Sequence, residues 1–245
     1  MIYYIQKYGG GSRLLPKSTT QVKRTSIREQ VYLRIQEWII SGELKPGDKL
    51  KDQQLADALG TSRTPIREAL LRLEEEGMVQ TKANSWTQVA PVDIQQAHRL
   101  YPMIWTLEKL AVSFAQANIK PEHIRQLGAI NEELERALEQ ENALDAQQCD
   151  ARFHQVIIDL SANEELIGVL DGLKKKLRRY EVAYFNGFSG AEQSVEEHKA
   201  IIAALIDGNF AAAAENIEIN WKNSFRRRFA ALETNGFANV LLEDE

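Results

Sequence analysis

The spacing of apolar residues predicts three short helices and a hairpin in the first part of the chain. Between residues 26 and 40, apolar side chains recur three or four positions apart, which is typical of a helix with one buried face. Similar patterns predict helices at 52–59 and 62–76, and a glycine follows each of the three. Alternating residues at 78–81 and 86–90 then predict two strands joined by a turn.

The rest of the chain predicts only helices. Six further segments have helical spacing and are separated by short polar, proline or glycine breaks: 93–117, 121–139, 143–160, 163–184, 191–207 and 210–232. Short links between neighbouring helices favour an antiparallel bundle. The expected fold class is mainly α, with an N-terminal winged helix-turn-helix followed by an all-α antiparallel helical bundle. The expected domains are a flexible tail (1–25), the winged helix-turn-helix (26–90), the helical domain (91–235) and a C-terminal tail (236–245).

Charge is distributed unevenly along the 245 residues, whose net charge is −5. Residues 1–90 hold 14 Lys or Arg against 10 Asp or Glu, whereas residues 91–245 hold 16 against 25. The basic part suits a polyanion such as DNA. The single cysteine, Cys149, excludes an internal disulfide, and neither a membrane-spanning apolar run nor a secretory signal is evident. These features predict a cytoplasmic protein.

The predicted helix at 62–76 has the features of a helix that reads DNA. Its core face is predicted from four apolar residues: Ile66, Ala69, Leu70 and Leu73. Arg67 lies on the other side and Arg63 at the edge, and arginine can hold guanine O6 and N7 through two hydrogen bonds. We therefore expect these two arginines to read bases, and Ser62 and Thr64 to contact phosphate or base. The alternative is structural: Arg67 pairs with a nearby glutamate, and Arg63 is solvated.

The most specific motif reads GTSRTPIREALLRLEEEGMV and is preceded by SGELKPGDKLKDQQLADAL. This sequence resembles the winged-helix domain of GntR-type bacterial transcription regulators, over about residues 26–90. The resemblance implies a wing that reaches the minor groove. It also implies major-groove contacts by the residues at the start of the third helix: Ser62, Arg63, Thr64 and Arg67.

Two departures from the family pattern affect the predicted DNA contacts. Gln53 stands where the related fatty-acid-responsive regulator has an arginine, so Gln53 could hydrogen-bond a base or phosphate but makes no charge contact. The wing also lacks the glycine expected at its tip, where Asn84 could adopt a left-handed turn instead. Gln53, Asn84 and Ser85 complete the set of candidate DNA-binding residues.

Four polar residues stand out in the predicted bundle. Asp150 and His154 are four positions apart and share one helix face, while His198 and Asn220 lie on later helices. Side chains from neighbouring helices can converge in a bundle core, and this set of nitrogen and oxygen ligands would suit Zn²⁺, Ni²⁺ or Mn²⁺. The alternative is that each histidine is simply a hydrogen-bonded core residue.

The pattern from DARFH to EEHKAIIAALIDGNFAAAAENIEINW resembles the effector-binding domain of the FadR subfamily, often called FCD, over about residues 95–232. Many members bind a divalent metal through one Asp and three His, and a small carboxylate completes the coordination. Asp150, His154 and His198 match three of these positions. Asn220 occupies the fourth, and an amide oxygen is a weaker ligand than imidazole. Three protein ligands plus water remain a feasible set.

The resemblance also bears on the effector. Many members carry an inward arginine four residues before the Glu of a Leu-Glu pair, but that position is Ile104 here, with Leu107 and Glu108 retained. The pocket is therefore expected to be less cationic, and the effector less strongly anionic than a dicarboxylate. Arg178 and Tyr180 are candidate effector contacts. The alternative is that Arg178 and Arg179 extend the solvated basic stretch of Lys174 to Lys176.

These features predict a ligand-responsive transcription regulator and not an enzyme. It would bind a pseudo-palindromic DNA operator as a homodimer, and repression is the commoner mode in the family. Two alternatives are a metal-dependent hydrolase that uses the bundle site and an architectural DNA binder that senses no ligand. No convincing general base accompanies the metal candidates, and the basic N-terminal part would be unexplained in a hydrolase.

Overall fold

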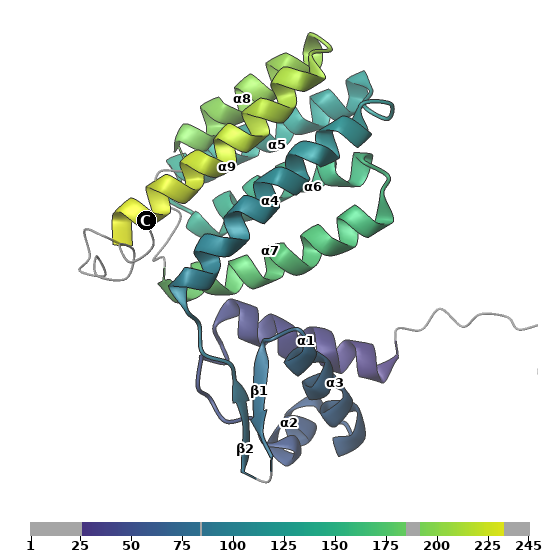
Figure 1. Cartoon of the computed structure of the whole chain (residues 1–245), viewed down its shortest axis with the longest axis vertical. Helices are drawn as coiled ribbons and strands as arrows, with labels where there is room; N and C mark the ends of the chain where they lie inside the picture. Colours follow the sequence, from purple (N-terminus) through teal and green to yellow (C-terminus); the bar gives the residue numbers. More distant parts are fainter. Residues whose placement is uncertain (1–25, 84, 185–191, 233–245) are drawn as a thin grey trace, which may run out of the picture.

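The computed structural model describes residues 26–83, 85–184 and 192–232. Three helices and a two-stranded sheet form a small unit beside a larger helical bundle (Figure 1). The elements of the small unit are α1 (Ile27–Ser41), α2 (Asp52–Leu59), α3 (Arg63–Glu75), β1 (Val79–Lys82) and β2 (Trp86–Val89). The strands are antiparallel, and their register runs from the pair Val79–Val89 to the pair Lys82–Trp86. This is the predicted winged helix-turn-helix.

Local sequence signals explain where α1 begins and ends. The Ser26 hydroxyl accepts a hydrogen bond from the Glu29 backbone N–H at 3.2 Å, which caps the helix. Gly42 ends α1 in the left-handed conformation with φ 80°, which glycine adopts without strain. A Cβ at Gly42 would also lie 3.2 Å from the side chain of Val182 in the bundle, so a larger residue would be crowded there.

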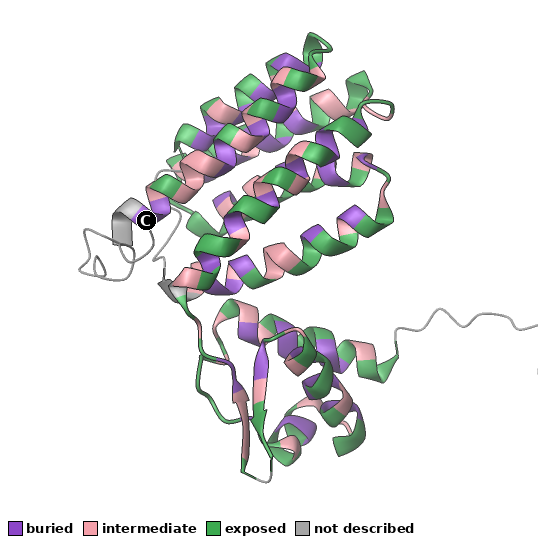
Figure 2. Cartoon of the chain, viewed as in Figure 1, coloured by how far each residue is buried: buried purple, intermediate pink, exposed green. Residues whose placement is uncertain are grey.

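The small unit has its own hydrophobic core. The predicted inner face of α3 is buried, including Ile66 and Leu73 at 0% exposure. These residues pack with α1 and with the hairpin, in a cluster that includes Val31, Ile35, Leu55, Met78 and Val89. The outer face of α3 remains exposed (Figure 2). Burial of one face therefore fixes which side of α3 is available to a partner.

The larger unit is a bundle of six helices among the described residues. They are α4 (Ile94–Ala115), α5 (Pro121–Glu139), α6 (Ala143–Leu160), α7 (Glu164–Tyr184), α8 (Glu192–Ile206) and α9 (Phe210–Leu232). Helix α4 packs against α6, α7 and α9, and α8 packs against α5 and α9. Each helix that contributes to the core buries one side and exposes the other (Figure 2). The bundle core is formed from these buried sides.

The predicted secondary structure is confirmed within the described residues. Each predicted helix and strand begins and ends within two residues of its observed bounds. Among the described residues, no helix combines the length and the apolar character that crossing a membrane requires. Asn84, the proposed residue of the wing tip, lies outside the described residues.

The two units meet where α1 packs against α7. Arg179 of α7 is 5% exposed, and its guanidinium donates to backbone carbonyls of the winged helix-turn-helix. The acceptors are the carbonyl of Ala90, that of Gly77 at 3.4 Å and that of Pro91 at 3.5 Å. The alternative that Arg179 extends a solvated basic stretch is therefore wrong, because this side chain is buried at the junction of the two units.

Candidate functional site

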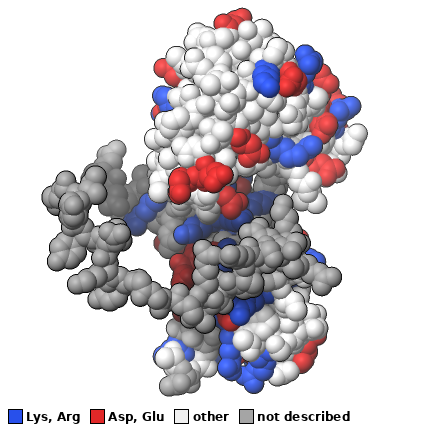
Figure 3. Space-filling view, turned by 90° about the vertical axis from the view of Figure 1, so that its right-hand side faces the viewer, with Lys and Arg blue, Asp and Glu red and all other residues white. Residues whose placement is uncertain are grey.

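The start of α3 presents the predicted DNA-reading residues to solvent. Ser62, Arg63, Thr64 and Arg67 are all exposed. Ser62 is the N-cap residue, and no side-chain hydrogen bond caps the helix there. The first-turn N–H groups of α3 are therefore left for another acceptor, and a helix N-terminus favours an anion such as phosphate. Figure 3 shows Lys and Arg side chains gathered at the lower end of this unit.

The two candidate reading arginines share an acidic partner. The Asp52 carboxylate, at the start of α2, accepts a hydrogen bond from Arg67 Nε at 2.6 Å and lies 3.7 Å from Arg63 Nη2. The structural alternative had a nearby glutamate as the partner of Arg67 and a merely solvated Arg63. The observed partner is instead an aspartate fifteen residues earlier, and sequence reasoning missed it because the pairing depends on how α2 packs on α3.

The other candidate DNA contacts also lie on the surface. Gln53 is exposed, and its side-chain amide donates to Asp57 Oδ1 at 2.8 Å. Ser85 is exposed at the wing, where its backbone N–H donates to the Lys82 carbonyl at 2.9 Å. Both residues are thus accessible to a ligand that approaches α3 and the wing.

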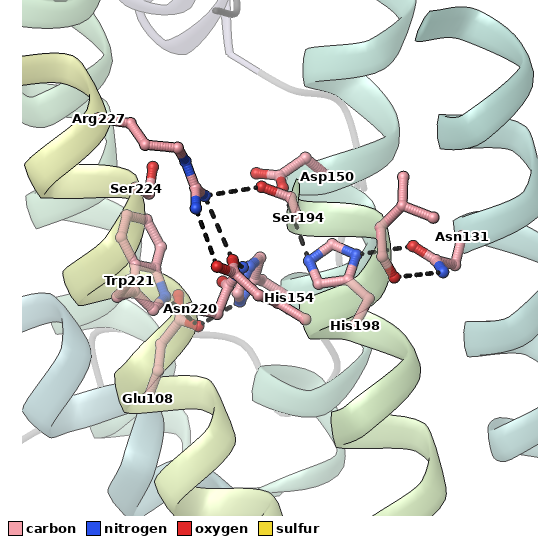
Figure 4. A network of polar contacts seen from close by, with 12 residues as sticks. Glu108, Asn131, Asp150, His154, Ser194, His198, Asn220, Trp221, Ser224 and Arg227 are labelled. Carbon is pink, nitrogen blue, oxygen red and sulfur yellow. Dashed lines mark hydrogen bonds and ion pairs between the residues drawn. The ribbon is translucent and has the colours of Figure 1, made fainter. Parts of the chain in front are cut away.

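A second candidate site lies inside the bundle. Asp150 and His154 of α6 meet His198 of α8, and one potential ligand atom from each lies within 4.8 Å of the others. His198 Nε2 is 3.6 Å from Asp150 Oδ1. Figure 4 shows these side chains converging from their helices. The structure therefore brings together three of the four residues predicted as metal ligands.

Hydrogen bonds on the outer side of both imidazoles determine which nitrogen faces the cluster. His154 Nδ1 lies 2.7 Å from Glu108 Oε2, so Nδ1 carries the proton and donates to the carboxylate. His198 Nδ1 lies 3.0 Å from Asn131 Oδ1, whose own amide nitrogen donates to the Val195 carbonyl. His198 Nδ1 is therefore also the donor. Each ring keeps Nε2 as a free lone pair, which is the arrangement of metal-binding histidines.

Burial leaves His198 neutral, with one ring nitrogen that lacks a hydrogen-bond partner among the described residues. His198 is fully buried, and its Nε2 has no hydrogen-bond partner within the described residues. This burial, together with the neighbouring His154, lowers the pKa of His198 well below its usual range, so the ring is neutral. The His198 ring also stacks on Phe153, with centroids 3.7 Å apart. An unpaired buried acceptor is unfavourable, and a metal ion would remove the penalty.

Asn220 is oriented by a second acidic residue. Its amide nitrogen donates to Glu197 Oε2 at 2.8 Å, which leaves Oδ1 as the atom that could act as a ligand. Glu197 also accepts from Asn223 and from Arg227, each at 2.9 Å. Asn220 lines the same cavity as Asp150 and His154. The aspartate and the two histidines fit a divalent metal that keeps a coordination position open to water or a ligand, and Asn220 lies in the wall of the same cavity.

Glu108 connects its own helix, α4, with three other helices at the site. This buried carboxylate on α4 accepts from His154, from Lys174 Nζ at 2.7 Å and from Trp221 Nε1 at 2.9 Å. Burial opposes its charge, yet Lys174 and His154 hold the pKa of Glu108 well below the usual range. The sequence identified Glu108 only through a resemblance. Its role in orienting His154, like that of Asn131 beside His198, becomes visible only in the folded chain.

The cluster opens onto a cavity of about 450 Å³. Its basic lining residues come from α7 and α9: Lys174, Lys175, Arg178 and Arg228. Ile104, which stands at the position of the inward arginine, is buried in the bundle core. Neighbouring helices therefore supply cations where α4 has none, but Asp150, Asp171 and Glu181 line the same cavity. The expectation that the pocket is less cationic than is usual in the family stays a prediction. Ile40 of α1 also lines the cavity, so the cavity reaches the winged helix-turn-helix.

The two candidate effector contacts have different surroundings. Arg178 lines the cavity, and no hydrogen bond or ion pair within 4.0 Å joins it to another described residue, whereas Lys174, Lys175 and Arg228 each pair with an acid. Tyr180 does not line the cavity. It is buried, and its hydroxyl donates to Gln96 Oε1 on α4 at 2.5 Å. Tyr180 is therefore a packing residue in this fold, and its prediction as an effector contact is wrong.

Comparison with known proteins finds a matching family for each of the two units of the chain. Residues 22–89 match the family described as bacterial regulatory proteins, gntR family, and residues 99–219 match the FCD domain. The Nta operon transcriptional regulator of Aminobacter aminovorans is 30% identical over 168 residues, which cover 69% of this chain and 78% of the relative. The HTH-type transcriptional regulator YdhC of Bacillus subtilis (strain 168) is 26% identical over 196 residues, which cover 80% and 88%.

Solved structures show the same fold. The structure of E. coli McbR/YncC superposes with a TM-score of 0.69 at 24% identity, over 84% of this chain and 99% of that one. The matched families and relatives are transcription regulators and not enzymes, so the hydrolase alternative has no support among them. This chain belongs to the GntR family of bacterial transcription regulators and carries an FCD domain behind its winged helix-turn-helix.

Proposed function

We propose that this transcription regulator responds to a small ligand: residues 26–90 bind operator DNA, and residues 91–235 bind a metabolite together with a divalent metal. The observation that carries the sensing half is the pair of histidines with Nδ1 held by an acceptor and Nε2 free beside Asp150. A domain that only shaped DNA would not need such a buried donor set. This distinguishes a sensor from an architectural DNA binder.

The DNA-binding half rests on the exposed N-terminal turn of α3. Arg63 and Arg67 would read bases, Ser62 and Thr64 would contact phosphate or base, and Gln53 and the wing (Asn84, Ser85) would flank them. A gel-shift titration with DNA from upstream of the gene itself tests this. We expect binding that prefers one sequence and weakens steeply with salt. Binding that is equally strong on scrambled DNA would contradict the proposal.

The metal would be held by Asp150, His154 and His198, with Asn220 as a weaker fourth ligand, and Zn²⁺, Ni²⁺ and Mn²⁺ all suit these donors. When bound, the metal supplies positive charge and an open position for an oxygen ligand. The protein's own residues orient both imidazoles and exclude water from the inner side of the cluster. Elemental analysis of protein purified without chelators tests the assignment, and a metal-free, fully folded preparation that binds none of the three ions would contradict it.

The effector would be a small carboxylate or related metabolite. The support for this is Arg178, which faces the same cavity as Asp150 and His154 and has no acidic partner within 4.0 Å among the described residues. A thermal-shift screen with carboxylates and sugar acids tests the class of ligand. Arg178→Ala should abolish the shift given by a hit, whereas Lys176→Ala, on the exposed side of the same helix, should keep it. Equal shifts in both variants would argue against Arg178.

A homodimer would place two winged helices on a two-fold operator. Between residues 102 and 115, the exposed positions of α4 include Met103, Leu110 and Phe114, and the partly exposed Lys109 beside them is paired with Glu218 at 2.6 Å. We propose that this face meets the same face of a second copy. Leu110→Glu should yield a monomer by light scattering and weaken operator binding, while Val169→Glu, at an exposed apolar position of α7, should stay dimeric. Effector binding would then favour one arrangement of the two winged helices, and repression is the mode that the family resemblance favours.

A further inference from the structure

Asp52 occupies a position from which it touches both candidate reading arginines. It is the first residue of α2, and its side chain is 23% exposed, compared with 64% for Arg67 and 53% for Arg63. Other acids near α3 are engaged elsewhere: Glu68 pairs with Arg28, and Glu29 with Arg72. Among the described residues, Asp52 is the acid that lies within 4.0 Å of Arg63 and Arg67.

The contact with Arg67 engages one particular nitrogen. Asp52 Oδ2 accepts from Nε at 2.6 Å, and no hydrogen bond or ion pair within 4.0 Å joins Nη1 or Nη2 of Arg67 to another described residue. A guanidinium is planar and holds its five N–H donors in a fixed fork. With Nε engaged by Asp52, the edge formed by the two terminal nitrogens is left for another pair of acceptors. Guanine offers two acceptors, O6 and N7, on its major-groove edge, and a pair of terminal nitrogens matches them.

We propose that Asp52 is a positioning residue for DNA recognition, which holds Arg67 so that its terminal nitrogens meet one guanine. This inference rests on the proposed DNA-reading role of α3. An ion pair this exposed contributes little to folding stability, so its effect is to be found in binding. Fixing a flexible arginine before binding removes part of the ordering that a base contact would otherwise require.

The negative charge of Asp52 has a second effect, which weakens the affinity for DNA of any sequence. A carboxylate beside the groove repels phosphates, and this repulsion acts on every sequence alike. On the preferred site the positioned arginine outweighs the repulsion, whereas on scrambled DNA only the repulsion remains. Asp52 should therefore raise the ratio of specific to non-specific affinity. A residue that merely repelled DNA would weaken both kinds of binding and leave that ratio unchanged.

The test uses the full-length chain. Its preferred duplex is first selected from a random pool, and affinities are then measured by fluorescence anisotropy on that duplex, on a scrambled duplex, and on duplexes carrying 7-deazaguanine at single positions. The base analogue lacks N7 and so removes one acceptor. In the wild type, one guanine in each half-site should lose about tenfold in affinity when replaced, on the scale of a bidentate contact.

Three variants separate positioning from charge. Asp52→Ala should bind the selected duplex about tenfold more weakly and the scrambled duplex no more weakly than wild type does, and should lose the 7-deazaguanine effect. Asp52→Asn keeps an oxygen acceptor without the charge and should retain more specificity than Asp52→Ala. Asp57→Ala removes an acid from the same helix that pairs with Gln53 and not with an arginine, so it should retain the 7-deazaguanine effect. Circular dichroism and melting temperature establish that each variant is folded.

The double variant Asp52→Ala/Arg67→Ala should bind no more weakly than Arg67→Ala alone, because Asp52 acts through Arg67. Additive losses would overturn the inference, as would equal tightening of the selected and scrambled duplexes by Asp52→Ala. If wild type selects no sequence at all, the DNA-reading proposal falls and the Asp52 inference falls with it. If selection succeeds and Asp52→Ala behaves as wild type, only the role of Asp52 is refuted.

Discussion

Replacing Glu108 by alanine tests how one buried carboxylate supports both the bundle and the candidate metal site. Glu108 is 2% exposed and accepts hydrogen bonds from side chains on three other helices. The substitution leaves the N–H groups of His154 and Trp221 buried without an acceptor, and it leaves the Lys174 ammonium without its carboxylate. Glu108→Gln keeps the shape and one acceptor oxygen, so it isolates the loss of charge.

The expected destabilisation follows from these contacts. Each buried donor left unsatisfied costs roughly 1–3 kcal/mol. Lys174 is 20% exposed, so partial hydration softens the loss of its partner. The total for Glu108→Ala is therefore about 3–5 kcal/mol, in line with breaking a buried ion pair by removing one member. Glu133→Ala is the matched control, because Glu133 forms its ion pair with Arg152 on the surface and should cost less than about 1 kcal/mol.

Two measurements check this prediction. Urea unfolding of the full chain, followed by circular dichroism, reports the loss of stability. Competition with a chromogenic chelator reports Zn²⁺ affinity, which should fall about 10–100-fold in Glu108→Gln, because His154 loses the negative charge of the partner that raises its basicity as a ligand. The reasoning is refuted if Glu108→Ala unfolds at the same urea concentration as Glu133→Ala, or if Glu108→Gln binds Zn²⁺ as tightly as wild type.

Other predictions concern the metal, the junction and alkaline stability. His198→Ala should abolish a Zn²⁺-dependent rise in melting temperature, and Asn220→His should enlarge that rise because imidazole is a stronger ligand than an amide. Unchanged shifts in differential scanning fluorimetry would count against these ligands. Arg179→Ala should speed amide hydrogen exchange at residues 78–92, because three backbone carbonyls lose their donor, and unaltered exchange would mean that the contact does not hold the junction. Burial and the Glu76 carboxylate raise the pKa of Tyr32, so the folded state keeps a proton that the unfolded chain releases. Stability should therefore fall as pH rises above about 10, by up to about 1.4 kcal/mol per pH unit, and Tyr32→Phe should show a shallower slope in urea midpoints.

The sequence by itself determined the elements and their faces. Helical spacing of apolar residues, with a glycine after each of the first three helices, located every described helix within two residues, and alternation located both strands. The same spacing placed Leu73 inside and Arg67 outside on α3, because the side of a helix that a residue occupies depends only on its position in the repeat. It also placed Asp150 and His154 on one face of α6.

Only the tertiary structure decided what each of those faces meets. The pairing of Asp52 with Arg67, and the approach of His198 to Asp150, depend on how separate helices pack. Tyr180 and Arg179, which looked like pocket or solvent residues, are buried between elements distant in sequence. Periodicity fixes the side of its own helix on which a residue lies. Which residue it meets there depends on how all the helices pack against one another.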